Sequence, residues 1–300
     1  MTRRTAIPGL DAPARTDLAV LKPFNATAAG KADDLGFARF VANLPWWLPA
    51  GLAFAFMMWP AIAYAQSVDY TIGDAFTALV RWLPFLVFQG FAFNILISVV
   101  TMALGTITGV VLGLMQISPN PAISRPAWLI TQTFRNSPWL VLLFIVMLAF
   151  PFQLNLGFAV IPIPDWMKAV FGLALPIMAN ISEVVRGAIN SVPNGQWEAA
   201  ESLAYSRQQT LWRIILPQCI KRMIPPWMNW YAILTMATPL VSLLGVEEIV
   251  TLSRQAMAAE NGRPELLVPF YGFCLVIFFV YCYPIARWTI ALERKYAVKL

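Results

Sequence analysis

Histidine is absent from the 300 residues of the chain, and charged residues make up only 12% of it. Without imidazole, histidine metal sites, histidine general bases and proton relays through that ring are excluded. The three cysteines, Cys219, Cys274 and Cys282, lack metal-ligand spacing, so we expect them to pack as apolar residues. The sequence also lacks a phosphate-binding loop and a dinucleotide-binding fingerprint. If the protein uses ATP, a partner must bind it.

The scarcity of charge excludes an ordinary soluble domain, in which about 25% of the residues are charged. Here 59% of the residues are hydrophobic and the mean hydropathy is +0.66. Because a membrane-spanning helix needs about 20 apolar residues, the sequence predicts an all-α polytopic membrane protein. The predicted spans are residues 46–65, about 91–117, about 138–153, about 168–187, 227–246 and 268–288. Residues 1–45 have no hydrophobic periodicity and are expected to form a disordered tail.

The basic residues orient these spans. With the N-terminus in the cytoplasm, 17 of the 21 Lys and Arg residues fall on the cytoplasmic side. The opposite side has only Arg81, Lys168, Arg254 and Arg263. Because cytoplasmic loops are enriched in Lys and Arg, both termini are expected in the cytoplasm. Residues 46–84 are then expected to hold a first span and an external segment.

A long cytoplasmic connection, residues 188–226, has the pattern of two short helices. Glu198 lies in the first turn of the first helix, where the helix dipole favours an acid. Ser206 and Gln209 fit a capping box for the second helix, which is expected to end just before Pro217. On the pattern alone, an amphipathic hairpin lying on the bilayer surface is an equal alternative.

The same connection resembles a known signature. Glu198-Ala-Ala, a small residue four positions later and Ile214-Ile-Leu-Pro217 match the E-A-A-x3-G-x9-I-x-L-P pattern of ABC importer permeases. Residues 183–196 (EVVRGAINSVPNGQ) and 135–138 (RNSP) resemble two further motifs of the polar-amino-acid branch of that family. The resemblance covers about residues 85–295. It assigns the contact with an ATPase to Glu198, Ala199, Ala200, Leu203, Ala204, Ile214, Leu216 and Pro217.

The resemblance implies a five-helix permease core at 85–295, with the predicted span 46–65 as an additional N-terminal helix. It also implies an inner-membrane complex of two permease subunits, two ATPase subunits that bind ATP and Mg²⁺, and an external solute-binding protein. The chain itself would be non-catalytic, in contact with lipid and not with nucleic acid. It would import a small polar solute, an amino acid, by alternating access. ATP-driven closure of the ATPases would move the docked short helices as a lever, with Glu198 facing a basic partner.

Two departures from the family pattern concern the backbone and the solute. The glycine of the family at the bend between the short helices is Ala204 here. Glycine reaches left-handed backbone angles freely and alanine does not, so the bend is either right-handed or strained. In the next-to-last helix, the family's K-[DE]-[ST]-[SA]-L is replaced by residues 236–240 (MATPL), which lack both charges.

Polar residues inside one of the predicted spans have two possible roles. Tyr231, Thr235, Thr238 and Ser242 are spaced to share one helix face, which suits a path for a zwitterion. Equally, such hydroxyls bond their own helix or pack between helices.

Gly105, Gly109 and Gly113 repeat every four residues, and this favours close helix packing within the subunit over dimerisation. Glu183 and Arg186, one turn apart, are interpreted as a structural ion pair rather than a solute ligand.

Two other classes of membrane protein compete with the importer subunit. A stand-alone secondary transporter would favour internal repeats and intramembrane proton or sodium ligands, and neither is evident in the sequence. A membrane enzyme would need a nucleophile with its base or a metal constellation, and we find no such pattern. Co-purification of an ATPase subunit separates the three classes.

Overall fold

The computed structural model describes residue 51, residues 70–155 and residues 160–296. The predicted tail 1–45 lies outside the described residues, and so does the predicted span 46–65 apart from residue 51.

The first long helix begins earlier than the sequence predicts. Thr71 and Asp74 form a capping box that starts α3 (Ile72–Phe85), which continues through a π-helical turn, η1 (Leu86–Phe91), into α4 (Ala92–Gln116). The π-helical turn begins two residues after Pro84, which has no N–H to donate. Part of the segment expected to be an external connection is therefore helical and continuous with the predicted span 91–117.

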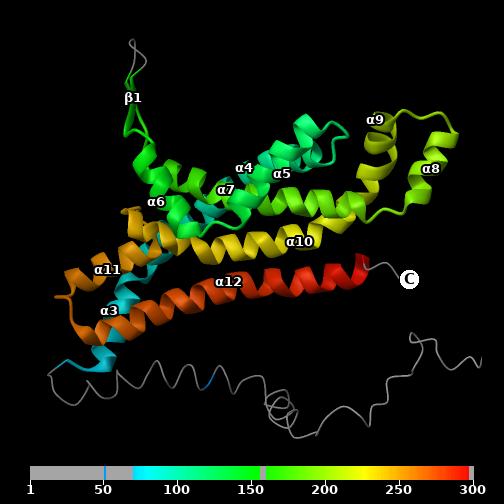
Figure 1. The fold of residues 1–300 in the computed structure, drawn as a ribbon. Coiled ribbons are helices and arrows are strands. Elements are labelled where there is room, and N and C mark those ends of the chain that lie inside the picture. The colour runs from blue at the N-terminus through cyan, green and yellow to red at the C-terminus, as the bar shows by residue number, and fades with distance from the viewer. Residues whose placement is uncertain (1–50, 52–69, 156–159, 297–300) are drawn as a thin grey trace, which may run out of the picture. The chain divides into compact units, whose positions relative to one another are not determined.

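The predicted span 138–153 is wrong as a single spanning helix. Its helix, α6 (Trp139–Ala149), has 11 residues and rises only about 16 Å, about half of a bilayer core. It follows α5 (Pro121–Arg135) across a bend of 105°. The chain then forms an antiparallel hairpin of β1 (Gln153–Asn155) and β2 (Val160–Pro162), which projects from one end of the bundle in Figure 1. Ser137-Pro138 explains the bend, because a proline disfavours helix in the residue before it.

The remaining elements complete the helical bundle of Figure 1. They are α7 (Asp165–Asn190), α8 (Asn194–Ser202), α9 (Arg207–Thr210), η2 (Leu211–Ile215), α10 (Leu216–Ala237), η3 (Thr238–Leu244), α11 (Ile249–Ala259), η4 (Pro264–Leu266) and α12 (Leu267–Tyr296). Among the described residues, three helices are long and apolar enough to cross a membrane, and five spans result if each of two bent helix pairs is one span. This count agrees with the five-helix core that the resemblance implies.

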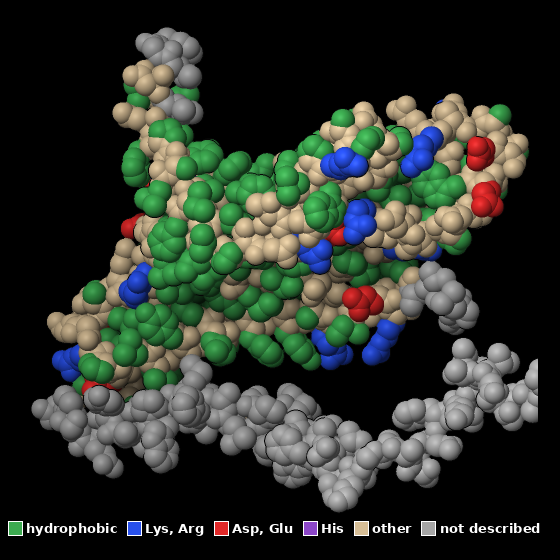
Figure 2. Space-filling model, in the orientation of Figure 1, with side chains coloured by type: hydrophobic (Ala, Val, Ile, Leu, Met, Phe, Trp, Pro, Cys, Tyr) green, Lys and Arg blue, Asp and Glu red, His purple; other side chains and the backbone are tan. Residues whose placement is uncertain are grey.

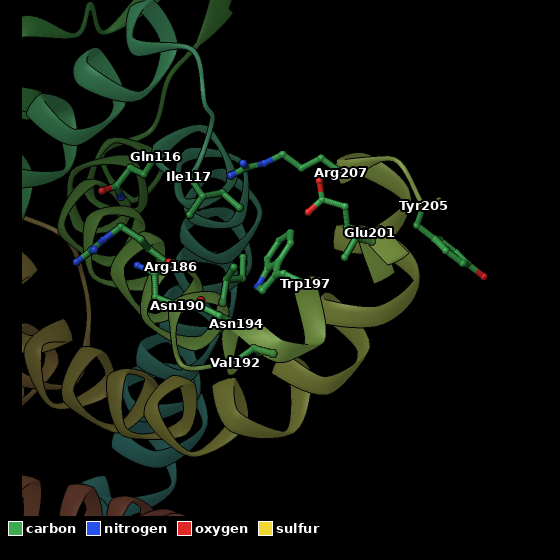
Figure 3. A pocket seen from close by; sticks show the side chains of 12 residues that line it. Gln116, Ile117, Arg186, Asn190, Val192, Asn194, Trp197, Glu201, Tyr205 and Arg207 are labelled. Carbon is green, nitrogen blue, oxygen red and sulfur yellow. The ribbon is translucent and has the colours of Figure 1, made fainter. Parts of the chain in front are cut away.

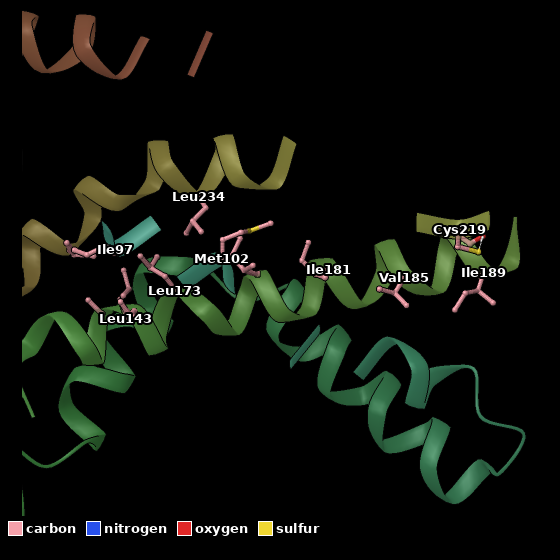
Figure 4. Close-up of a cluster of buried hydrophobic side chains, with 14 of the residues drawn as sticks. Ile97, Met102, Leu143, Leu173, Ile181, Val185, Ile189, Cys219 and Leu234 are labelled. Carbon is pink, nitrogen blue, oxygen red and sulfur yellow. Dashed lines mark hydrogen bonds between the residues drawn. The ribbon is translucent and has the colours of Figure 1, made fainter. Parts of the chain in front are cut away.

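The core lies where α4, α7 and α10 meet (Figure 4). Ile97, Leu173 and Leu234, one from each helix, have no exposed surface. A Cβ added to Gly109 would lie 2.8 Å from the Ile181 Cβ atom and 2.8 Å from a backbone oxygen of α7. The glycines of α4 therefore let α7 approach closely, which confirms the packing interpretation of this seam.

Charged side chains gather toward the two ends of the bundle, with hydrophobic surface between them (Figure 2). Three of the four basic residues of the expected external side have acidic or aromatic partners. Arg81 pairs with Glu260 at 3.1 Å, and the buried Lys168 lies 3.3 Å from an Asp165 oxygen. Arg263 stacks over a tyrosine ring. This end of the bundle therefore presents little free positive charge.

Candidate coupling site

The short helix α8 projects from the end of the bundle opposite the β hairpin (Figure 1). Glu198 and Ala199 are exposed on it, whereas Ala200 is only 2% exposed. Leu203 follows the helix and is 72% exposed. Predicted contact residues are thus presented to solvent on a helix in which Ala200 alone is buried.

Ala204 has a left-handed backbone, with φ of 59°. The Tyr205 N–H donates to the Ala200 carbonyl at 3.1 Å, and the Ala204 N–H donates to the Glu201 carbonyl at 2.8 Å. These two bonds form the Schellman ending of a helix, in which the left-handed position is usually glycine. Of the two alternatives for the bend, the structure has the strained one.

The second short helix differs from the prediction at its far end. Its start is confirmed, because Ser206 and Gln209 form the expected capping box. The expected end before Pro217 is wrong, since the helical chain continues from α9 through η2 into α10. The Leu216 N–H bonds the Leu211 carbonyl five residues back, and Pro217 then occupies the first turn of α10, where a missing N–H is tolerated.

Ile214, Leu216 and Pro217 of the signature lie along this continuous stretch. Ile214 and Leu216 are half-buried against the core, and Pro217 is exposed. The start of α10 is held to the end of α7 by two contacts: the Cys219 Sγ lies 3.4 Å from the Ala188 carbonyl, and Arg222 donates to the Ser191 carbonyl at 2.9 Å. The loop is therefore connected to two core helices: it continues into α10, and α10 is bonded to the end of α7.

A cavity of about 710 Å³ separates α8 from the ends of α4 and α7 (Figure 3). Trp197, Glu201 and Arg207 line it on the side of the loop, and Gln116 and Arg186 line it on the side of the bundle. The Arg207 guanidinium lies 5.8 Å from the centroid of the Trp197 ring. Glu198 and Glu201 are both exposed, but only Glu201 lines this cavity.

Glu183 and Arg186 lie in bidentate contact on α7, with N···O distances of 2.6 and 3.2 Å. Arg135, at the end of α5, lies 3.6 Å from the same carboxylate. This third charge was not predicted from the sequence, although Arg135 is the first residue of the RNSP motif. Glu183 therefore ties α5 to α7 at the base of the coupling loop.

Of the four polar residues of the predicted path, Thr235, Thr238 and Ser242 are buried and Tyr231 is half-buried. The Thr235 and Thr238 hydroxyls donate to carbonyls of their own helical stretch at 2.9 and 2.8 Å. The Tyr231 hydroxyl lies 2.7 Å from that of Tyr281 on α12, and Ser242 is 9% exposed. A hydrogen bond to its own helix therefore accounts for Thr235, whereas the Thr238 hydroxyl also accepts from a side chain of α4.

A buried polar network around Glu248 was not predicted. The Asn94 side chain donates to Thr238 Oγ1 at 2.9 Å and to Glu248 Oε2 at 3.0 Å, and it accepts from the Ile249 N–H at 3.1 Å. Glu248 also caps α11 by accepting from the Thr251 N–H. The sequence did contain a signal of this network: Asn94 lies inside an apolar run, and a buried amide needs hydrogen-bond partners.

The described part of the chain holds no group of three Cys, Asp or Glu side chains that could bind a metal ion.

Comparison with known proteins gives consistent matches. Residues 105–296 match the family model for the binding-protein-dependent transport system inner membrane component. The probable amino-acid ABC transporter permease protein YckA of Bacillus subtilis (strain 168) is 35% identical over 211 residues, which cover 70% of this chain and 89% of that protein. The arginine transport system permease protein ArtQ of the same organism is 32% identical over 209 residues, covering 68% and 93%.

Two solved structures share the fold. One, an amino acid ABC transporter with histidines, superposes with a TM-score of 0.63 at 23% identity and covers 77% of this chain and 100% of the other. The other, the MetNI methionine ABC transporter in an inward-facing conformation, has a TM-score of 0.57 at 15% identity, covering 72% and 98%.

Proposed function

The chain belongs to the family of binding-protein-dependent transport system inner membrane components, and from this premise we propose that it carries an amino acid from periplasm to cytoplasm. It is the membrane-spanning subunit of an ATP-driven importer. The names of its relatives support an amino acid as the solute, since YckA is described as an amino-acid permease and ArtQ as an arginine permease.

In the proposed complex, ATP hydrolysis takes place in the partner subunits and not in this chain. Two ATPase subunits bind and hydrolyse ATP with Mg²⁺, an external solute-binding protein delivers the solute, and a second permease subunit, identical or related, completes the path. This chain contributes no catalytic residue. It responds to ATP because the ATPases hold α8 differently in their two states, and only such a difference shifts a conformational equilibrium.

The observation that carries the coupling proposal is a difference between two exposed glutamates on α8 in their relation to the cavity. Both side chains are exposed, but Glu201 lines the cavity and Glu198 does not. An exposed acid in a short projecting helix is available for a basic groove on an ATPase, and burial of such a pair makes its loss costly. Ala199 and Leu203 add exposed apolar surface beside it.

The helical continuity from Arg207 to Leu244 supplies the proposed lever. A displacement of α8 and α9 is transmitted along the backbone hydrogen bonds of η2 into α10, and through the Arg222–Ser191 contact to α7. The polar stripe from Tyr231 in α10 to Ser242 in η3 lies on this moving element. We propose that the solute passes this stripe when the two permease subunits rock between inward-open and outward-open states.

We also propose that both termini lie in the cytoplasm of a bacterium and that the loop between α7 and α10 faces the same side. The basic residues at that end of the bundle support this orientation. The partners follow from it, since ATPases meet the cytoplasmic end and the solute-binding protein meets the end with the β hairpin.

The test compares Glu198→Ala with Glu201→Ala in the complete importer. Loss of a desolvated charge pair costs about 2–5 kcal/mol, so Glu198→Ala is expected to weaken ATPase co-purification more than tenfold and to reduce solute uptake with it. Glu201→Ala is the matched control, because it makes the same truncation one turn away, at the exposed acid that lines the cavity.

Expression and membrane insertion of both variants should equal those of the parent chain. Equal, near-parental uptake in both variants would show that α8 is not the coupling element. Failure to co-purify any ATPase with the parent chain would contradict the importer proposal as a whole.

A further inference from the structure

An apolar groove of about 620 Å³ lies between α10 and α12, away from the coupling loop. Its walls are almost entirely apolar. They include Ile233 and Met236 of α10, Pro239 of η3, and Leu275, Phe279 and Tyr283 of α12. Met236 and Phe279 are 55% and 60% exposed, so the groove opens to the outside of the bundle.

The length of the groove matches one leaflet of a bilayer. Along α12 it extends from Cys274 to Ala286. At a rise of about 1.5 Å per residue these 12 steps span about 18 Å. Half of a hydrocarbon core of about 30 Å is about 15 Å. A single acyl chain aligned with α12 therefore fits the groove from the membrane interior to the headgroup level.

One end of the groove carries an unpaired cation. Arg287 directly follows Ala286, is exposed, and donates from Nη1 to the Tyr283 hydroxyl at 3.1 Å. Among the described residues no carboxylate lies within ion-pair distance of it. The neighbouring Trp288 is 64% exposed, as expected for an aromatic residue at a membrane interface.

More basic residues continue beyond this position. Arg294 and Lys295 lie in the last turn of α12. Figure 2 shows basic side chains around the C-terminal end of this helix. A positive headgroup region therefore adjoins the apolar groove on the same helix.

We propose that this groove is a binding site for an anionic phospholipid, with one acyl chain between α10 and α12 and the phosphate on Arg287. A guanidinium binds phosphate oxygens through paired hydrogen bonds. Basic pockets between membrane helices favour anionic headgroups. The Tyr283 hydroxyl, already bonded to Arg287, holds the guanidinium at the mouth of the groove. The site lies in the leaflet beside the C-terminal end of α12.

The experiment is native mass spectrometry of the purified full-length chain after addition of phosphatidylglycerol or phosphatidylcholine with the same acyl chains. One basic residue near a surface is worth roughly a fivefold preference for an anionic lipid. We expect the parent chain to retain phosphatidylglycerol about fivefold better than phosphatidylcholine. Arg287→Gln should abolish this preference, and Arg287→Lys should keep part of it.

Two further variants separate the headgroup from the groove. Arg125→Gln removes an exposed charge from α5 at the same end of the bundle and should leave the preference unchanged. Ala286→Phe narrows the groove and should reduce retention of both lipids while the thermal stability stays near that of the parent.

Three outcomes would overturn the proposal: equal retention of the two lipids by the parent, a preference that survives in Arg287→Gln, or loss of the preference in Arg125→Gln. A second copy of the chain seated in the groove would also overturn it. In that case Leu275→Cys would form a disulfide between copies and phosphatidylglycerol would not bind.

Discussion

At the scale of single residues, Ala204 shows how one side chain sets the geometry of the coupling loop. Its backbone is left-handed, a conformation that costs an L-residue roughly 1–2 kcal/mol and glycine almost nothing. The two hydrogen bonds that close α8 hold it there. The bend keeps the family's geometry without the family's glycine, so the strain is stored next to the proposed docking face.

This strain predicts the ranking of three variants. Ala204→Gly should leave the apparent melting temperature unchanged or raise it slightly, because relief of about 1–2 kcal/mol is partly offset by about 0.5–1 kcal/mol of extra chain entropy. Ala204→Val should lower it and weaken ATPase co-purification, since a branched Cβ is less tolerant of this backbone. Thermal unfolding in detergent measures both. Equal stability of the valine variant and the parent would mean that the bend is not left-handed.

Asn94 is the second residue with an outsized role, because three buried groups depend on it. Asn94→Ala leaves Thr238, Glu248 and the Ile249 N–H each without one partner. Unpaired buried polar groups cost about 1–3 kcal/mol each, so a marked fall in the melting temperature is expected. Asn229→Ala, at an exposed asparagine of α10, is the control and should change little. Similar stability of the two variants would refute the network.

At the scale of elements, the α4–α7 interface depends on the absence of side chains. Gly109→Ala should destabilise the chain by about 1–3 kcal/mol, the usual cost of overpacking, because the new Cβ meets backbone that cannot rotate away. Gly187→Ala is the matched control: nothing lies within 4 Å of its Cβ position, and alanine favours a helix by about 1 kcal/mol. Opposite shifts of the melting temperature are expected. A stable Gly109→Ala variant would show that the two helices can separate.

At the scale of the whole molecule, the orientation in the membrane is the remaining prediction. The cysteines at 219, 274 and 282 are buried, so an introduced cysteine reports its own side. An impermeant maleimide added to cells with permeabilised outer membranes should label Gln153→Cys in the hairpin and not Ser202→Cys in α8. Disruption of the inner membrane should expose Ser202→Cys to the reagent. Labelling in the reverse order would place α8 outside and exclude contact with a cytoplasmic ATPase.

The sequence by itself determined the class of the protein and the place of its signature. Low charge and apolar runs are properties of composition, and they require helices that satisfy their own backbone in a bilayer. The capping box of Ser206 and Gln209 is equally local, because both partners lie within one turn. The glycine repeat of α4 indicated a close helix contact for the same reason, since spacing along one helix fixes which residues share a face.

Only the tertiary structure decided features that depend on partners distant in the chain. Arg135 reaches Glu183, and Asn94 reaches Glu248, across separate helices. The short α6 and the continuous helix from α9 into α10 were also not predicted from the sequence. A proline can end a helix or lie in its first turn, and packing against α7 decides which of the two occurs. The left-handed backbone of Ala204 was not predictable either. The local preference of alanine disfavours this conformation, and the hydrogen bonds that end α8 outweigh that preference.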